Sequence, residues 1–98
     1  MTDELDPNAV ESGDSNEPAG GIARDVLDYL ARSIVDDPAG VEISSSQWRQ
    51  RVSLNLSVSP SDMGKVIGRR GRTAQAIRTV VRAAGARDGK DIHVDIVD

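Results

Sequence analysis

The sequence contains no cysteine, a single histidine and very few aromatic side chains. Its 98 residues include one Trp, one Tyr and no Phe. The absence of cysteine excludes disulfide bonds, zinc–thiolate sites and thiol nucleophiles. A single histidine cannot build a multi-histidine metal site and leaves only one candidate base for serine-type catalysis. We therefore expect no catalytic residues, no metal site and no cofactor.

Long apolar segments are also missing. No apolar run approaches the roughly 18 residues that cross a bilayer, and the acidic start of the chain lacks the apolar segment of a secretory signal. We therefore expect a cytoplasmic protein with no membrane partner and no small-molecule substrate. With 98 residues, 38% of them apolar, the chain can bury one modest aliphatic core and form one domain.

The net charge of −4 hides an uneven distribution. Residues 1–21 contain six acidic residues and no Lys or Arg, whereas residues 61–90 contain eight basic and two acidic residues. The first segment has too little apolar surface to offset the entropy of ordering, so we predict a disordered acidic tail over residues 1–21. The folded domain is predicted over residues 22–98, and its basic block is where we look for function.

Hydrophobic spacing predicts six elements. A helix over residues 22–35 has one apolar face, formed by Ile22, Val26, Leu27, Leu30, Ala31, Ile34 and Val35. Alternation predicts a short strand at 41–44 and a cleaner one at 52–58, joined by a polar connection around residues 46–50. The polar outer face of the second strand indicates a sheet covered by helices on one side only.

The second half is expected to contain two helices and a strand. Ser59 is the predicted N-cap of a short helix, with Asp62 as an acid in its first turn. A longer helix follows Gly71 and runs through about Arg87, with an inward stripe of Ala74, Ile77, Val81 and Ala84, supplemented by Val80. A last strand alternates over residues 92–96. The order predicts an α+β fold with three helices on a three-stranded sheet.

The most informative stretch is the corner between these two helices, Gly64-Lys65-Val66-Ile67-Gly68-Arg69-Arg70-Gly71-Arg72-Thr73. Gly68 and Gly71 lack a Cβ, so a phosphodiester can come close to the main chain. The N–H groups that begin the next helix favour an anion at the same place. Arg69 and Arg70 add charge and forked donors. The corner therefore predicts a phosphate-chain site.

Two common nucleotide sites do not fit this corner. A triphosphate-binding loop requires a Gly-Lys-Ser/Thr ending, but Gly64-Lys65 is followed by Val66. The glycine spacing also fails the dinucleotide pattern G-x-G-x-x-G. A helix–GxxG–helix corner that follows an amphipathic strand is typical of a clamp for a short single-stranded RNA segment.

The segment Val66-Ile67-Gly68-Arg69-Arg70-Gly71 resembles the signature of KH domains, and the order of elements is similar to the type II arrangement. More narrowly, residues 62–74, the following Ala76-Ile77-Arg78 and the terminal Ile96-Val97-Asp98 resemble the small bacterial single-KH RNA-binding proteins of the KhpA family. The likeness covers about residues 22–98. The acidic tail and the Ser-Gln-Trp connection depart from the pattern.

The resemblance implies a groove between the GxxG loop and the sheet that holds about four nucleotides. By position, the RNA-binding residues would be Gly64, Lys65, Ile67, Gly68, Arg69, Arg70, Gly71 and Arg72. Ile67 would contact unstacked bases at the floor of the groove. The resemblance also implies roles as a post-transcriptional regulator or RNA chaperone, and partners that include a second copy of the chain or a KhpB-like KH protein.

Several other residues have plainer explanations. We expect Arg78 and Arg82 to be solvated on an exposed helix face, with phosphate contact as the alternative. Arg87 and Lys90 are expected to lie favourably at a helix C-terminus. Trp48 is expected at a sheet edge or an interface, with base stacking as the alternative, and His93 is expected on the exposed side of its strand. Two alternatives to RNA binding stay open, which are a protein-interaction or dimerisation module and single-stranded DNA binding.

Overall fold

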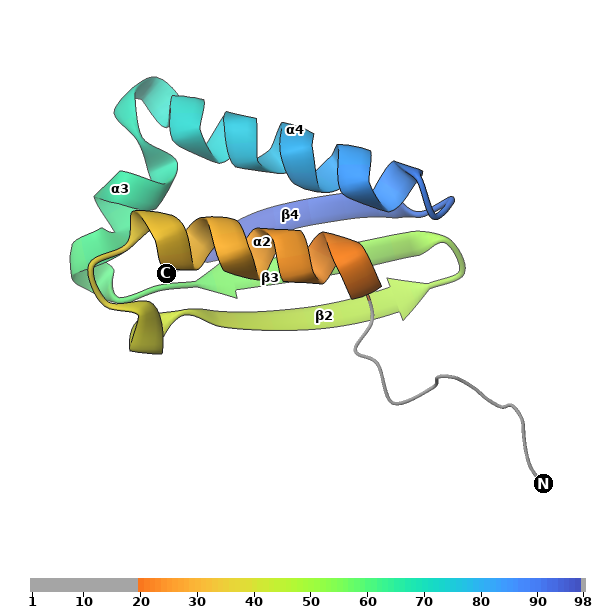
Figure 1. Cartoon of the computed structure of the whole chain (residues 1–98), viewed down its shortest axis with the longest axis horizontal. Coiled ribbons are helices and arrows are strands. Elements are labelled where there is room, and N and C mark those ends of the chain that lie inside the picture. Colours follow the sequence, from red (N-terminus) through yellow and green to blue (C-terminus); the bar gives the residue numbers. More distant parts are fainter. Residues whose placement is uncertain (1–19, 98) are drawn as a thin grey trace.

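The computed structural model describes residues 20–97, and three helices in this range cover one face of a three-stranded sheet (Figure 1). The elements in chain order are α2 (Gly21–Ile34), η1 (Pro38–Gly40), β2 (Glu42–Trp48), β3 (Arg51–Ser57), η2 (Pro60–Asp62), α3 (Met63–Ile67), η3 (Arg69–Gly71), α4 (Arg72–Ala86) and β4 (Asp91–Val97). The predicted α+β class and the order of its elements are confirmed. The predicted acidic tail lies outside the described residues, apart from Gly20 and Gly21.

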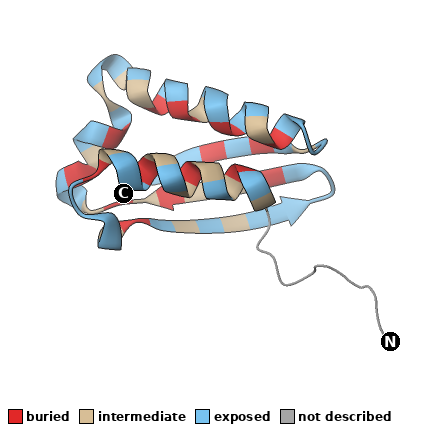
Figure 2. Ribbon diagram, viewed as in Figure 1, coloured by how far each residue is buried: buried red, intermediate tan, exposed pale blue. Residues whose placement is uncertain are grey.

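The sheet order is β2-β3-β4, so that β2 and β4 are the two edge strands. β2 pairs with β3 antiparallel, and β3 pairs with β4 in parallel register, which places Arg51 beside Asp91 and Ser53 beside His93. The alternation of β3 sends Val52, Leu54 and Leu56 into the core. The helices lie on that face only, and the buried residues of β3 alternate with the less buried Ser53, Asn55 and Ser57 of the other face; Figure 2 shows the burial of each element.

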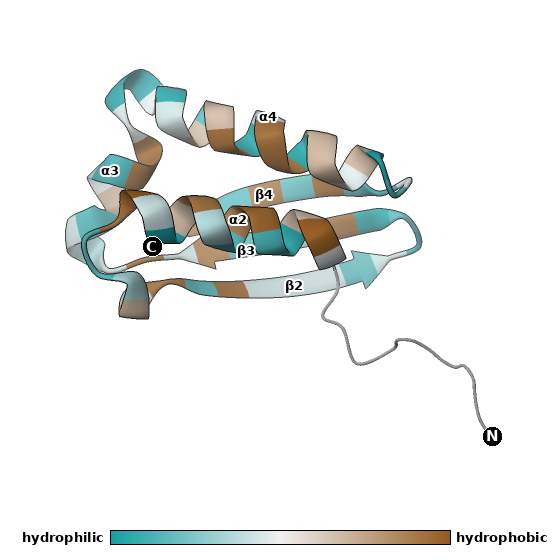
Figure 3. Ribbon diagram, viewed as in Figure 1, coloured by the Kyte–Doolittle hydropathy of each residue, from teal (hydrophilic) through white to brown (hydrophobic). Residues whose placement is uncertain are grey.

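The core is aliphatic and lies between the sheet and the helices, as the apolar stripes of Figure 3 show. Its fully buried members include Leu27 and Ala31 of α2, Val66 of α3, and Val81 of α4. No helix within residues 20–97 is long and apolar enough to cross a membrane.

Two predicted core positions are wrong. Ile22 and Val80 are exposed, whereas Ala23 and Gly85 are buried. The buried stripe of α2 is therefore rotated toward its small residues. At Gly85 a Cβ would lie only 2.1 Å from Cγ1 of Ile92, so the missing side chain allows α4 to approach β4 closely.

The predicted polar connection at residues 46–50 is also too long. β2 continues to Trp48, which pairs with Arg51, and only Arg49 and Gln50 form the turn. The seven residues of β2 extend because each finds a ladder partner on β3. Arg49 adopts a positive φ of 57°, and the side-chain amide of Gln47 donates to its carbonyl at 2.8 Å.

Ser59 does not cap the short helix through its side chain. Pro60–Asp62 form a 3-10 turn, and the Ser59 hydroxyl donates to Oδ2 of Asp37 at 2.5 Å. The long helix ends near the expected place. Gly89 has a φ of 72°, and the Lys90 N–H donates to the Gly85 carbonyl at 3.0 Å.

Candidate nucleic-acid interface

The Gly68–Gly71 corner is a tight turn between α3 and α4 that only glycine permits at its two ends. Gly68 has φ 75° and Gly71 has φ 73°, in the region that side chains with a Cβ rarely adopt. A Cβ on Gly68 would also lie 2.1 Å from the Thr73 hydroxyl. Around Gly71 the space that a Cβ would enter is open. The main chain at Gly71 is therefore approachable from outside.

Two of the backbone N–H groups that the sequence predicts to face an anion are hydrogen-bonded within the turn itself. The Gly71 N–H donates to the Gly68 carbonyl at 3.2 Å, and the Arg72 N–H donates to the Arg69 carbonyl. No side chain caps the start of α4. The prediction of free N–H groups at the start of the helix is thus wrong for these two amides, and the positive charge of the corner comes mainly from its arginine side chains.

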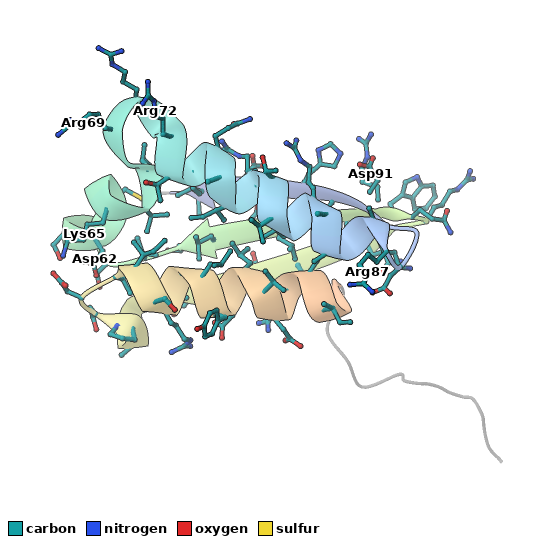
Figure 4. All side chains as sticks on the ribbon, turned by 45° about the horizontal axis from the view of Figure 1, so that its top comes forward. Asp62, Lys65, Arg69, Arg72, Arg87 and Asp91 are labelled. Atoms are coloured by element: carbon teal, nitrogen blue, oxygen red, sulfur yellow. The ribbon has the colours of Figure 1, made fainter. Side chains whose placement is uncertain are left out.

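Those side chains are exposed. Arg69, Arg70 and Arg72 all lie at the surface, and none of them forms an ion pair within residues 20–97. Figure 4 shows Arg69 and Arg72 projecting away from the body of the domain at this corner. Arg70 adopts a positive φ of 57° inside the turn. Among the described residues, the corner therefore presents three exposed guanidinium groups without an ion-pair partner around an accessible backbone.

Beside the corner, α3 contributes one exposed apolar side chain and one position without a side chain. Val66 is fully buried and anchors the helix, which leaves its neighbour Ile67 with 40% of its surface exposed. Gly64 is exposed, and nothing lies within 4 Å of the position that its Cβ would take. Ile67 is thus available for apolar contact, as the sequence predicts, and Gly64 leaves the adjoining surface open.

Lys65 lies on the side of α3 away from Ile67, and its ammonium group is already paired with a carboxylate. Its ammonium group donates to the carboxylate of Asp36 and lies near Asp62 in Figure 4, apart from Arg69 and Arg72. The hydrogen bond to Asp36 raises the pKa of Lys65 above its ordinary value, desolvation opposes the shift, and the charges of Asp36 and Asp62 add to it. Lys65 is therefore a paired cation rather than a free one.

Asp62 is a buried structural residue, whereas the sequence predicts it only as an acid in the first turn of the short helix. It is 1% exposed, and its two carboxylate oxygens accept hydrogen bonds from the N–H groups of Asp36 and Asp37 at 3.1 and 3.0 Å. This contact ties the end of α2 to the start of α3, directly before the GxxG corner. No local sequence pattern reveals it, because its partners lie about 25 residues earlier.

A groove lies between the edge strand β4 and α4, the helix that follows the GxxG corner. It has a volume of about 200 Å³ and is lined by Arg78, Arg82, Ile92, His93, Val94 and Asp95. The Arg78 Nε–H donates to the Val94 carbonyl at 3.0 Å. The expectation that Arg78 is merely solvated is wrong, because this half-buried side chain lies against the strand. No local pattern reveals this contact, because Val94 lies 16 residues later in the chain.

A second groove, of about 420 Å³, lies between α2 and β2 at the other edge of the sheet. Its charged residues are Arg24, Asp28, Arg32 and Glu42, and Arg32 is paired with Asp28 at 2.9 Å. The Arg24 guanidinium donates to the Ile43 carbonyl at 3.2 Å. The balanced charges do not favour a polyanion, so the smaller groove is the better candidate.

The remaining candidates occupy the expected surfaces. His93 is exposed on β4, where its side chain lies 3.4 Å from the Asp91 carboxylate. Trp48 is 71% exposed at the end of β2, with the Arg49 guanidinium 5.1 Å from its ring centroid. Within residues 20–97, no group of three or more His, Asp or Glu side chains is placed to hold a metal ion.

Comparison with known proteins agrees with this geometry. Residues 24–96 match the family described as KhpA/KhpB, KH domain. The chain belongs to this family. The expected type II KH arrangement is therefore confirmed, with β3 and β4 in parallel and α3, the GxxG corner and α4 between them.

Relatives in this family extend over most of the chain. The RNA-binding protein KhpA of Streptomyces coelicolor is 47% identical over 77 residues, which are 79% of this chain and 94% of the relative. KhpA of Clostridium acetobutylicum is 45% identical over 74 residues, 76% of this chain and 99% of the relative. KhpA of Bacillus subtilis is 42% identical over 74 residues, 76% and 91% of the two chains.

Solved structures of Era share the fold at low sequence identity. Aquifex aeolicus Era bound to GDP and AlF4⁻ superposes with a TM-score of 0.61 at 11% identity, over 98% of this chain and 36% of Era. Era in complex with MgGDPNP and nucleotides 1506–1542 of 16S ribosomal RNA gives a TM-score of 0.54 at 13% identity, over 96% and 35% of the two chains. The likeness shows that the same fold occurs as part of a larger protein.

Proposed function

We propose that this chain is an RNA-binding protein that holds a short single-stranded segment at the Gly68–Gly71 corner. The observation that carries the proposal is the set of three exposed arginines, Arg69, Arg70 and Arg72, around a main chain that glycine leaves approachable. Guanidinium groups bind phosphates through paired donors. The relatives of this chain are named RNA-binding proteins, which supports the same conclusion.

In this proposal the bases follow the groove between α4 and β4. Ile67 supplies apolar contact at the entrance, and Arg78 and Arg82 line the groove with His93. A KH site holds about four nucleotides and reads them through their unstacked edges. Gly64 keeps the surface beside the corner flat enough for the strand to enter. Lys65 joins the contact only when its pairing with Asp36 is released.

A binding measurement with full-length protein tests the proposal. Fluorescence anisotropy would compare a labelled unstructured RNA, the same sequence as DNA and a fully paired RNA duplex. We expect the unstructured RNA to bind, with an affinity that falls as salt is added because the arginines neutralise a few phosphates. The DNA arm determines whether the site distinguishes the two sugars, since the backbone contacts alone accept either.

The decisive variant is the double substitution Arg69→Asp and Arg70→Asp. Aspartate tolerates the positive φ at position 70 better than most residues, so the fold should persist. We expect RNA affinity to fall at least tenfold, with unchanged circular dichroism. Arg32→Asp, on α2 beside the other groove, makes the same charge change as either single substitution and should have little effect. A loss below threefold for the double variant would refute the clamp.

A further inference from the structure

The hairpin tip between β2 and β3 presents the most exposed aromatic side chain near the sheet. Trp48 is 71% exposed, and it ends β2 opposite Arg51, which in turn pairs with Asp91 on β4. Residues opposite one another in register share a face of a sheet, so these three side chains lie on the helix-free face. The large flat indole is mostly exposed there, with the Arg49 guanidinium over its ring, and this makes it a candidate contact surface.

The backbone at this tip is strained in the same way as the GxxG corner. Arg49 and Arg70 are the two non-glycine residues with positive φ in residues 20–97, both at 57°. Two-residue hairpin turns of this kind favour Asn or Gly, which adopt positive φ readily. An arginine at this position therefore costs conformational energy, and strain of this sort is a feature of functional sites. At the tip, the strained arginine lies over the Trp48 ring.

The surroundings of the tip are basic. The Asp91 N–H donates to the Gln50 carbonyl at 2.7 Å, which places the loop after α4 directly beside the hairpin. This end of the domain therefore brings together four basic and two acidic side chains, namely Arg49, Arg51, Arg87, Lys90, Asp88 and Asp91. The Asp91 carboxylate lies 3.7 Å from Nε of Arg51, which compensates part of its charge. Figure 4 shows Arg87 and Asp91 at this end, away from Arg69 and Arg72.

The tip lies at the end of the domain where α4 ends and β4 begins, and the Asp91 N–H of β4 donates to the Gln50 carbonyl of the tip. The GxxG corner lies at one end of α4 and the hairpin tip at the other (Figure 1), with Arg78 and Arg82 along the groove between them. A helix of 15 residues is about 22 Å long. At about 3.4 Å for each stacked nucleotide, about six nucleotides cover that length. A strand of more than about six nucleotides, longer than the about four that one KH groove holds, would therefore extend past α4 toward the tip.

We propose that Trp48, together with Arg49 and Arg51, forms a second nucleic-acid contact, a base-stacking site for the part of the single strand that leaves the α4–β4 groove. The inference rests on the proposed function and extends its footprint. Indole rings stack on any nucleobase, and arginine adds phosphate and cation–π contacts. The site would therefore lengthen the bound segment without adding a sequence preference.

The chain offers a direct probe, because Trp48 is its only tryptophan. Full-length protein would be titrated with unlabelled single-stranded RNA of about four and about ten nucleotides while tryptophan emission is recorded. Stacking of a base on the indole should quench the emission with the longer RNA and leave it unchanged with the shorter one. Anisotropy of the same RNAs, carrying a label, measures the affinity independently of the indole.

Substitution provides the second measurement. Trp48→Ala should weaken the longer RNA at least fivefold and leave the shorter RNA within twofold, whereas Trp48→Tyr should restore most of the loss. Tyr29→Ala is the matched control, because Tyr29 is also 71% exposed but lies on α2. Since Trp48 is at the surface, all three variants should keep the melting temperature of the wild type.

The outcomes separate the two proposals. Quenching by the longer RNA together with the length-dependent loss in Trp48→Ala supports the stacking site. Binding of both RNAs without quenching, or with equal affinity for Trp48→Ala, overturns the stacking site and leaves the RNA clamp intact. If neither RNA binds, both the RNA clamp and the stacking site are overturned. A change in oligomeric state for Trp48→Ala at unchanged RNA affinity assigns Trp48 to a protein contact and overturns the stacking site.

Discussion

The ammonium group of Lys65 is hydrogen-bonded to the carboxylate of Asp36, a residue 29 positions earlier in the chain. Asp36 lies in the segment after α2, and the main-chain N–H groups of this segment are held by the buried Asp62. The basic side chain that the sequence assigns to the RNA site thus has an internal anionic partner. A phosphate and Asp36 would compete for the same cation.

Release of Lys65 should strengthen RNA binding. Asp36→Asn removes the competing carboxylate and keeps the backbone N–H that Asp62 accepts, so we expect affinity to rise about two- to fivefold and the salt slope to steepen by about one unit. Asp28→Asn makes the same charge change on α2, where Asp28 is paired with Arg32. An equal rise in both variants, measured by anisotropy against salt concentration, would show that Lys65 makes no contact with RNA.

The same ion pair predicts a dependence of stability on pH. Folding raises the pKa of Lys65 above its ordinary value of 10.5, chiefly through the hydrogen bond to Asp36. The contribution of this pair is therefore complete below pH 10.5 and is lost as the pH rises through the pKa of the folded state. The difference in melting temperature between the wild type and Lys65→Gln should shrink over that range. A difference that stays constant with pH would contradict this assignment.

Loss of the Asp62 carboxylate should destabilise the whole domain. Asp62→Ala leaves two main-chain donors, those of Asp36 and Asp37, without their partner. Each unsatisfied donor costs about 1–3 kcal/mol, so we expect about 2–4 kcal/mol in urea unfolding and a melting temperature lower by about 10–20 °C. Ser61→Ala, at the exposed neighbouring position, should change stability little. A loss below about 0.5 kcal/mol for Asp62→Ala would mean that these hydrogen bonds do not hold the loop.

Gly85→Ala should destabilise the domain although alanine favours helices. Its Cβ would lie 2.1 Å from Cγ1 of Ile92, and overpacking of this kind costs about 1–3 kcal/mol, more than the about 1 kcal/mol gained in helix propensity. In the double variant Gly85→Ala with Ile92→Ala, the loss of stability in denaturant unfolding should be smaller than the sum of the losses in the two single variants. A net gain in stability for Gly85→Ala would show that β4 moves aside easily.

Gly64→Ala is the matched control for a helix glycine, because nothing lies within 4 Å of the new methyl group. We expect it to stabilise the domain by up to about 1 kcal/mol. If Gly64 belongs to the RNA surface, the same variant should also bind RNA more weakly, so that stability and affinity change in opposite directions.

The sequence predicts the parts of this molecule that depend on short-range pattern. The alternation of β3 and the apolar spacing of α4 each depend on residues a few positions apart, and both are found where the pattern places them, apart from the exposed Val80. The phase of α2 is an exception. Ile22 is exposed and Ala23 is buried, because close packing of α2 on α4 selects small side chains over apolar character.

The contacts that shape the candidate site join residues distant in sequence, and no local pattern reveals them. Lys65 is paired with a residue 29 positions away, and Arg78 donates to a carbonyl 16 positions away. From the linear sequence, Arg78 is expected to be solvated and Lys65 to be a cation of the RNA site. Only the fold shows that one of them is held by Asp36 and that the other lines a groove.

The arginines at the two open sides of the sheet also bear on the solubility of the chain. Arg24 donates to a carbonyl of β2 at 3.2 Å, and Arg78 donates to a carbonyl of β4 at 3.0 Å. An unpaired strand edge is a template on which foreign strands add and aggregate. At each edge, the guanidinium hydrogen bond occupies a carbonyl acceptor that an incoming strand would need. Loss of either arginine should therefore promote aggregation even where the native fold survives.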